Sequence, residues 1–457
     1  MISFLPIGGG NEIGANCYYL NFNGNGIILD CGIHPQKTGI ESLPNFDLIK
    51  DKPIDWCLIS HAHQDHIGSL PFLVKKFPYV KVITTPQTRA LTELTLHNSI
   101  SILKKEIEEQ NFEFYNHDEV DLLIKMIGYK EYENPFELNS FHQLNESQVQ
   151  ATFYDAGHIL GSASILLENI DHKILYTSDI NLSQQTLQTG AKLPKIKIDT
   201  LILETTYGAT DSKLFLEWND ESLRFAKEAN KILNNGGSIL IPVFSLGKTQ
   251  EMLATIWQLM RKKKLTNVDI FTGGIGTKIN RVYDYNRFVV DCVDKEFELN
   301  TIPQNNYYEI ESAEDFFKHP CIVLASSGMM IKSTASYNFA KRWLMQKNSA
   351  IFLVGYMDPE SPGYVISNSK QGDKIQLGEK DEITKVKCQI KNFKFSAHAR
   401  RECLLQIVED LDPESVILTH GDTNAIEWMG SSILKKNKNI KVKIAEVGKA
   451  INIFSCQ

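Results

Sequence analysis

From position 60 to position 68 the chain reads Ser60-His61-Ala62-His63-Gln64-Asp65-His66-Ile67-Gly68. The stretch follows an apolar run over 56–59, which predicts a buried strand that ends just before the histidines. Side chains two positions apart on an extended segment share a face, so His61 and His63 can bind one ion. A helix is expected to follow over 67–77, and the turn into it would aim Asp65 and His66 at a second ion.

The donors in this stretch are typical of a catalytic metal site. Imidazole nitrogens mixed with a carboxylate oxygen suit zinc or a similar cation, and catalytic sites keep one position open for water. A histidine-rich surface loop is the alternative interpretation. The spacing of the four donors favours the metal site.

The composition is typical of a soluble globular protein with more than one domain. The chain has 457 residues, of which 42% are hydrophobic and 23% are charged. It contains no apolar stretch of about eighteen residues, and its first residues lack the basic segment of a signal peptide. Its eight cysteines are scattered, without a Cys-x-x-Cys pair. This pattern favours free thiols in a reducing compartment, so we expect a cytoplasmic protein without membrane association.

Net charge does not decide whether the chain binds nucleic acid. The formal net charge is -7, which counts mildly against a polyanionic partner. Two basic runs, over 261–264 and 435–438, could contact phosphates, although each is more often a solvated helix end.

Acidic residues and histidines also end apolar runs elsewhere in the chain. These runs are predicted as strands, and the residues at or just after their ends are Asp30, His158, Asp179, Glu204, His398 and His420. Functional groups gather at the carboxyl ends of strands in open sheets, so we expect these residues to share one site. Asp30 is best interpreted as an acceptor that orients a ligand histidine.

The sequence pattern changes near residue 209, where helices and strands begin to alternate. This alternation predicts an α/β region with a largely parallel sheet and helices on both faces. A segment rich in glycine, serine and charge, over 360–382, leads out of this region. The tail then returns to apolar runs that end at histidines.

Taken together, these residues resemble the motif set of metallo-β-lactamase-fold hydrolases of the β-CASP group. The group's His-x-His-x-Asp-His motif is matched at 61–66, its isolated histidine by His158 and its isolated aspartate by Asp179. Three additional motifs are matched by Leu203-Glu204-Thr205-Thr206-Tyr207-Gly208, Phe395-Ser396-Ala397-His398-Ala399 and Thr419-His420-Gly421-Asp422. Within the group, the second of these is similar to the nuclease subunit of the cleavage and polyadenylation specificity factor and its prokaryotic relatives.

The resemblance implies the fold and the domain borders. It implies an αββα metallo-β-lactamase sandwich with an inserted β-CASP α/β domain. The first part of the metallo-β-lactamase domain would comprise 1–208, the inserted domain 209–385 and the returning part 386–457.

The resemblance also implies a two-zinc ribonuclease. It would act as an endonuclease in which a hydroxide bridging the metals attacks the phosphodiester and a histidine acts as general acid. One zinc would be held by His61, His63 and His158, the other by Asp65, His66 and His420, and Asp179 would bridge them. His398 would be the general acid, oriented by Glu204, and Ser326 would contact a substrate phosphate. Single-stranded RNA is the expected partner, and the chain could form a homodimer.

Three alternatives stay open at this stage. The same metals can hydrolyse DNA, because only contacts to the 2′-OH separate the two backbones. A small-molecule ester or thioester hydrolase would need the metal ligands but neither an inserted domain nor His398. A non-catalytic scaffold is disfavoured because every ligand position is filled. Departures from the family at Ser327 and over 358–364 lie on the inserted domain, so they bear on substrate binding rather than on the metals.

Overall fold

The computed structural model describes residues 2–107, 114–139 and 149–453, and the chain divides into two compact units. Unit 1 comprises Met1–Ser183, Gly190–Ser212 and His398–Gln457, and unit 2 comprises Gln184–Thr189 and Lys213–Ala397. Within the described residues, no helix is both long enough and apolar enough to span a bilayer. The seven described cysteines are all free, and Cys456 lies outside the described residues.

Unit 1 is built on two sheets, each with seven strands among the described residues. The first has the order β22-β1-β2-β3-β4-β5-β6, with β22 (Ile451–Ile453), β1 (Ile2–Gly8), β2 (Cys17–Phe22), β3 (Asn25–Leu29), β4 (Trp56–Leu58), β5 (Lys81–Thr84) and β6 (Gly128–Tyr129). The second has the order β21-β20-β11-β10-β9-β8-β7, with β21 (Lys441–Ile444), β20 (Ser415–Thr419), β11 (Thr200–Glu204), β10 (Lys173–Tyr176), β9 (Ala163–Glu168), β8 (Val149–Asp155) and β7 (Phe136–Leu138).

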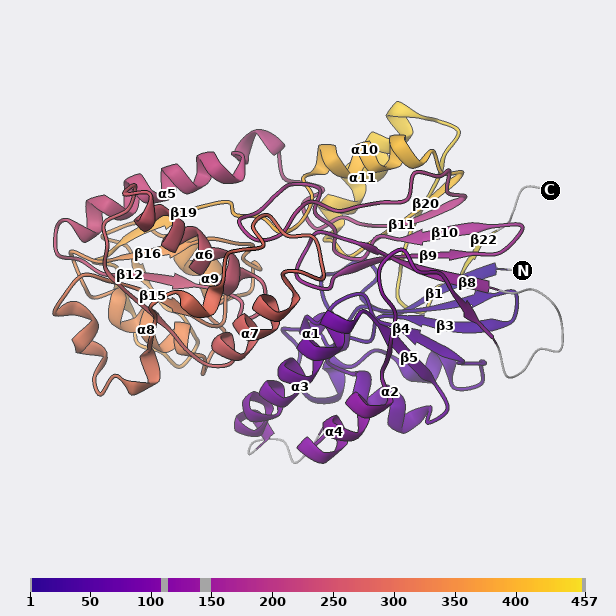
Figure 1. The fold of residues 1–457 in the computed structure, drawn as a ribbon, viewed down its shortest axis with the longest axis horizontal. Coiled ribbons are helices and arrows are strands. Elements are labelled where there is room, and N and C mark those ends of the chain that lie inside the picture. The colour runs from indigo at the N-terminus through magenta and orange to yellow at the C-terminus, as the bar shows by residue number, and fades with distance from the viewer. Residues whose placement is uncertain (1, 108–113, 140–148, 454–457) are drawn as a thin grey trace. The chain divides into compact units, whose positions relative to one another are not determined.

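The two sheets of unit 1 pack face to face. Leu20 and Leu58 of the first sheet share one buried cluster with Ile165 and Ile202 of the second. Helices α10 (Arg401–Leu411) and α11 (Thr423–Lys436) bury their apolar sides against the other face of the second sheet. Figure 1 shows the helices on the side of the first sheet, which are α1 (Gln64–Ile67), α2 (Leu70–Lys76), α3 (Pro86–Ile107) and α4 (His117–Met126). The predicted αββα sandwich is therefore confirmed.

Unit 2 contains a parallel sheet, as the alternating pattern predicted. Its order is β14-β13-β15-β12-β16-β19, with β14 (Asn305–Asn306), β13 (Asp269–Thr272), β15 (Cys321–Ala325), β12 (Ile239–Pro242), β16 (Ala350–Leu353) and β19 (Gln389–Asn392). The named helices of the unit are α5 (Trp218–Leu233), α6 (Lys248–Arg261), α7 (Gly276–Asn286), α8 (Ala335–Trp343) and α9 (Pro362–Ser367).

Helices cover both faces of this parallel sheet. Trp343 of α8 lies in one buried cluster with Leu353 of β16. Phe225 of α5 instead packs edge-to-face against Phe352, the adjacent residue of the same strand. Adjacent residues of a strand point to opposite faces, so the two helices lie on opposite sides. Because β19 pairs with β16, the compact unit extends to Ala397, beyond the border at 385 that the sequence suggested.

A buried carboxylate in α6 holds a separate segment of unit 2. The side chain of Glu251 accepts hydrogen bonds from the backbone N–H groups of Thr186, Leu187 and Gln188, at 2.8, 2.9 and 3.0 Å. One turn earlier, Lys248 donates to the carbonyl oxygen of Phe395. Burial raises the pKa of Glu251 to about 7 and lowers that of Lys248 to about 8.

Glu251 should therefore make the stability of unit 2 depend on pH. Its carboxyl group has an ordinary pKa of 4.5, so between about pH 5 and about pH 7 it is ionised in the unfolded chain and largely protonated in the folded chain. The contribution of Glu251 to the stability of the folded chain is complete below the pKa of its carboxyl group in the unfolded chain. It is lost as the pH rises through the pKa of that group in the folded chain. Relative to Glu251→Gln, the parent should lose roughly 1 kcal/mol per pH unit at most across this range.

Urea unfolding at several pH values, followed by tryptophan fluorescence, measures this difference. Lys248 stays protonated in both states over the same range, so it does not contribute to the slope. The exposed Glu382 gives a matched control, because Glu382→Gln should leave the pH dependence of the parent unchanged. Parallel pH profiles for the parent and Glu251→Gln would contradict the prediction.

Candidate metal centre

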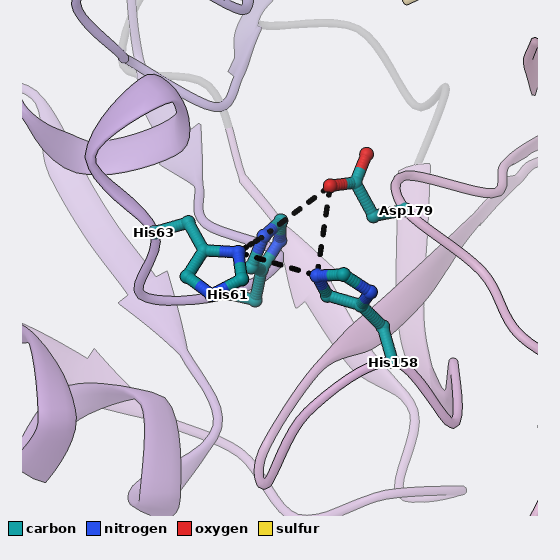
Figure 2. A group of neighbouring side chains, drawn as sticks. All are labelled: His61, His63, His158 and Asp179. Atoms are coloured by element: carbon teal, nitrogen blue, oxygen red, sulfur yellow. Dashed lines mark hydrogen bonds and ion pairs between the residues drawn. The ribbon is translucent and has the colours of Figure 1, made fainter. Parts of the chain in front are cut away.

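One group of donors gathers at the strand ends of unit 1 (Figure 2). His61 and His63 lie between β4 and α1, His158 follows β8 and Asp179 follows β10. Nδ1 of His63 lies 3.1 Å from Nε2 of His61 and 3.2 Å from Nε2 of His158. Oδ2 of Asp179 lies 3.6 Å from the His61 nitrogen and 3.7 Å from the His158 nitrogen. The four donors thus converge on one point from three separate segments.

A second group lies beside the first and consists of Asp65, His66 and His420. Oδ2 of Asp65 lies 3.7 Å from Nε2 of His66 and 3.5 Å from Nε2 of His420. Oδ2 of Asp179, which belongs to the first group, is also 3.5 Å from Nε2 of His66. Asp179 is therefore placed between the two groups. The Asp65 side chain is 23% exposed, so solvent reaches this edge of the site.

The spacing of these donors fits metal ions. A tetrahedral zinc with bonds of about 2.1 Å holds its ligands roughly 3.4 Å apart. The donor distances lie close to that value, at 3.1–3.7 Å in the first group and 3.5–3.7 Å in the second. In addition, Nε2 of His420 is buried and makes no hydrogen bond, which is costly for a ring nitrogen unless another group meets it. The residues present therefore fit two divalent cations.

The charges of the site favour cations as well. Burial lowers the pKa of His61 well below its ordinary value, so this ring keeps a lone pair for a ligand. Burial opposes ionisation of Asp179, yet the surrounding histidines hold the pKa of this carboxyl well below its ordinary range. Burial likewise opposes a charge on His66, but the neighbouring aspartates raise its pKa well above the ordinary value. The carboxylates thus create a negative potential, which bound metal ions would match.

His398 and Glu204 form a third group with Asp179. Nδ1 of His398 lies 3.2 Å from Oε1 of Glu204, and the His398 ring centroid is 4.6 Å from that of His158. The same carboxylate accepts hydrogen bonds from the backbone N–H groups of Ile180, at 3.1 Å, and Thr206, at 3.0 Å. Glu204 is only 1% exposed and is held by these contacts, so it is better suited to orient the imidazole than to bind a metal. Burial opposes a charge on His398, but Glu204 and Asp179 raise its pKa.

Two predicted residues lie outside these groups. Asp30 is fully buried behind the site, and its Oδ2 accepts a hydrogen bond from Nδ1 of His66 at 2.8 Å. Its role in orienting a ligand histidine stays a prediction. Ser326 lies in unit 2, directly after β15. Its contact with a substrate phosphate stays a prediction.

Sequence reasoning missed the hydroxyl groups that contact the ligand histidines. Oγ of Ser60 lies 3.1 Å from Nδ1 of His61, and Oγ1 of Thr206 lies 3.1 Å from Nδ1 of His420. Both occupy strand ends, immediately before His61 and two residues after Glu204. Proximity to a predicted site residue is a signal in the sequence, but serine and threonine are too common at such positions for it to identify them.

Family models match three successive parts of the chain. Residues 10–202 match the metallo-beta-lactamase superfamily, residues 249–366 the Beta-Casp domain and residues 383–445 the Zn-dependent metallo-hydrolase RNA specificity domain. Fold and donor set are thus those of the metallo-hydrolase class. Within that class, the chain belongs to the β-CASP group of the metallo-β-lactamase superfamily, as the motifs predicted.

Curated relatives match nearly the whole chain. Subunit 3 of the cleavage and polyadenylation specificity factor from Dictyostelium discoideum is 30% identical, and the match covers 97% of this chain and 56% of that protein. Cleavage and polyadenylation specificity factor 73 of Drosophila melanogaster is 30% identical over 93% of this chain and 60% of its own length. Endoribonuclease YSH1 of Yarrowia lipolytica is 27% identical over 96% and 52%. The chain thus spans little more than half the length of these relatives.

A solved structure shares the fold. A crystal structure of a protein of unknown function from Enterococcus faecalis V583 matches with a TM-score of 0.55. The match covers 98% of this chain and 99% of that chain, at 13% sequence identity. At that identity the likeness concerns the fold alone.

Proposed function

We propose that this chain is a two-zinc endoribonuclease that hydrolyses phosphodiester bonds of single-stranded RNA. The observation that carries the proposal is the pair of adjacent donor groups with Asp179 between them. The match to an RNA specificity domain and the relatives named as endoribonucleases support RNA as the substrate. The free thiols of the described residues support the proposed cytoplasmic location.

In this proposal the chain's donors hold two metal ions. His61, His63 and His158 would hold one zinc, Asp65, His66 and His420 the other, and Asp179 would contact both. When bound, such a pair of ions lowers the pKa of water and neutralises charge on a phosphate group.

His398 would move the proton that the leaving oxygen needs. Glu204 binds Nδ1 of His398, which leaves Nε2 as the ring nitrogen that can deliver a proton. Because Glu204 is itself fixed by the N–H groups of Ile180 and Thr206, the imidazole is held in one orientation. A positioned donor of this kind contributes to the rate without binding the metals.

Chelator-sensitive cleavage of RNA tests the proposed function. The purified protein should cut an end-labelled single-stranded RNA at internal positions, and a chelator should abolish the cleavage until zinc is restored. A DNA oligomer of the same sequence and a small ester serve as alternative substrates in the same assay. Cleavage confined to DNA, or turnover of the ester without nuclease activity, would contradict the proposal. Zinc-loaded protein that cleaves none of the three would instead indicate a scaffold.

A further inference from the structure

A hydrogen-bonded network lies directly behind the metal centre and contains Asp30, Ser60, Tyr176 and Ser178. Each of these side chains is at most 2% exposed. Oδ1 of Asp30 accepts a hydrogen bond from the backbone N–H of Ser60 at 2.7 Å. Its Oδ2 accepts from the hydroxyl groups of Ser60, at 2.8 Å, and Tyr176, at 2.7 Å, as well as from Nδ1 of His66. One carboxylate therefore organises the whole network.

Counting donors and acceptors fixes the hydrogen bonds of the Ser60 hydroxyl. A hydroxyl group has one proton and two lone pairs, and a carboxylate can only accept. The Ser60 proton therefore goes to Asp30, and one lone pair accepts from the Ser178 hydroxyl at 2.7 Å. Nδ1 of His61, at 3.1 Å, must then donate to the second lone pair, because Nδ1 of His66 lies farther away, at 3.5 Å, and donates to Asp30.

This assignment determines which ring nitrogen of His61 carries the proton and which one is left unprotonated for a metal ion. With its proton on Nδ1, the neutral His61 ring presents an unprotonated Nε2, the atom that lies near His63 and Asp179. His66 also donates through Nδ1, so its Nε2 faces Asp65 and Asp179. His61 belongs to the first donor group and His66 to the second. Asp30 reaches His66 directly and His61 through a single hydroxyl group.

We propose that Ser60 is a positioning residue that couples the two donor groups, because its hydroxyl contacts both His61 of the first group and Asp30, which holds His66 of the second. The inference rests on the proposed metal binding. Partners behind metal ligands fix ring orientation and tautomer, and losing one typically costs about 10- to 100-fold in metal affinity. Ser60→Ala should therefore weaken zinc binding by that factor in both donor groups. Loss of a residue that orients His61 alone would weaken zinc binding in the first group only.

Each donor group can be tested in a variant that disables the other. His420→Ala leaves the first group and His158→Ala leaves the second, and competition with a chromophoric chelator measures zinc affinity in each. Adding Ser60→Ala should weaken binding about 10- to 100-fold in both backgrounds. Adding Ser60→Thr, which restores the hydroxyl, should bring the affinity back. Ser164→Ala is the matched control, because this fully buried hydroxyl donates to the carbonyl oxygen of Thr177 at 2.8 Å instead.

The tautomer of His61 provides a readout that does not depend on zinc. Nitrogen-15 spectra of histidine-labelled, zinc-free protein should show His61 protonated on Nδ1 in the parent, and this preference should disappear in Ser60→Ala. A parent that binds no zinc but keeps this tautomer would contradict the proposed function and leave the network intact. Unchanged affinity in either background, or a His61 protonated on Nε2 in the parent, would overturn the coupling role of Ser60.

Discussion

Replacing Asp179 with asparagine is expected to lower the zinc content from about two ions per chain to near zero. Oδ2 of Asp179 lies within 3.7 Å of ring nitrogens from both donor groups, namely those of His61, His158 and His66. A neutral amide is a poor ligand for two cations at once. The substitution also removes the negative charge of the carboxylate, which offsets the repulsion between the two cations. The loss of affinity should exceed the roughly 100-fold upper limit for residues behind the ligands. RNA cleavage should fall with the metal content.

Elemental analysis of protein purified without chelator measures this effect directly. Asp171 offers a matched control, because it is an exposed aspartate of the same unit, and Asp171→Asn should keep both zinc ions. If Asp179→Asn also kept both ions, Asp179 would not be the shared ligand. If the parent itself contained no zinc and cleaved RNA regardless of chelator, the two-metal proposal would be wrong.

The fold of unit 1 was predicted through the family resemblance, whose motif residues coincide with strand ends. Acidic residues and histidines that end apolar runs are local signals, and the structure places those runs in two packed sheets. The helix after the histidine motif was predicted less well. It was expected over 67–77, but α1 begins at Gln64 and a second helix, α2, starts after Ser69 with Pro71 in its first turn. Proline is tolerated there but not in a helix interior, which favours two short helices over one.

Other features depended on contacts between distant residues and gave no local signal. Glu251 binds the backbone of 186–188, more than sixty positions earlier in the chain. Ser60 and Tyr176 meet Asp30 from two different sheets, and serine and tyrosine are too common at strand ends for such a role to be recognised from sequence alone. The polar network behind the two donor groups therefore became visible only from the structure.

Replacing His398 with alanine should slow RNA cleavage by roughly a hundredfold or more while both zinc ions stay bound. That factor is the usual contribution of a general acid. Metal binding should persist because His398 is held by Glu204 and is not needed to complete either of the two donor groups. Single-turnover cleavage of end-labelled RNA, together with elemental analysis of the same sample, measures both quantities. His319→Ala, which removes an exposed imidazole of unit 2, should cleave at the parent rate.

Two further variants distinguish proton donation from metal binding. Glu204→Gln should reduce the rate less than His398→Ala, because it changes the orientation of the imidazole and leaves the ring in place. His420→Ala should lose zinc together with activity, because its Nε2 is the buried ring nitrogen that faces Asp65 without a hydrogen bond. If His398→Ala lost a zinc ion and His420→Ala retained both, the ligand and the acid would have been exchanged. If His398→Ala cleaved RNA at the parent rate, its contact with Glu204 would serve only to stabilise the fold.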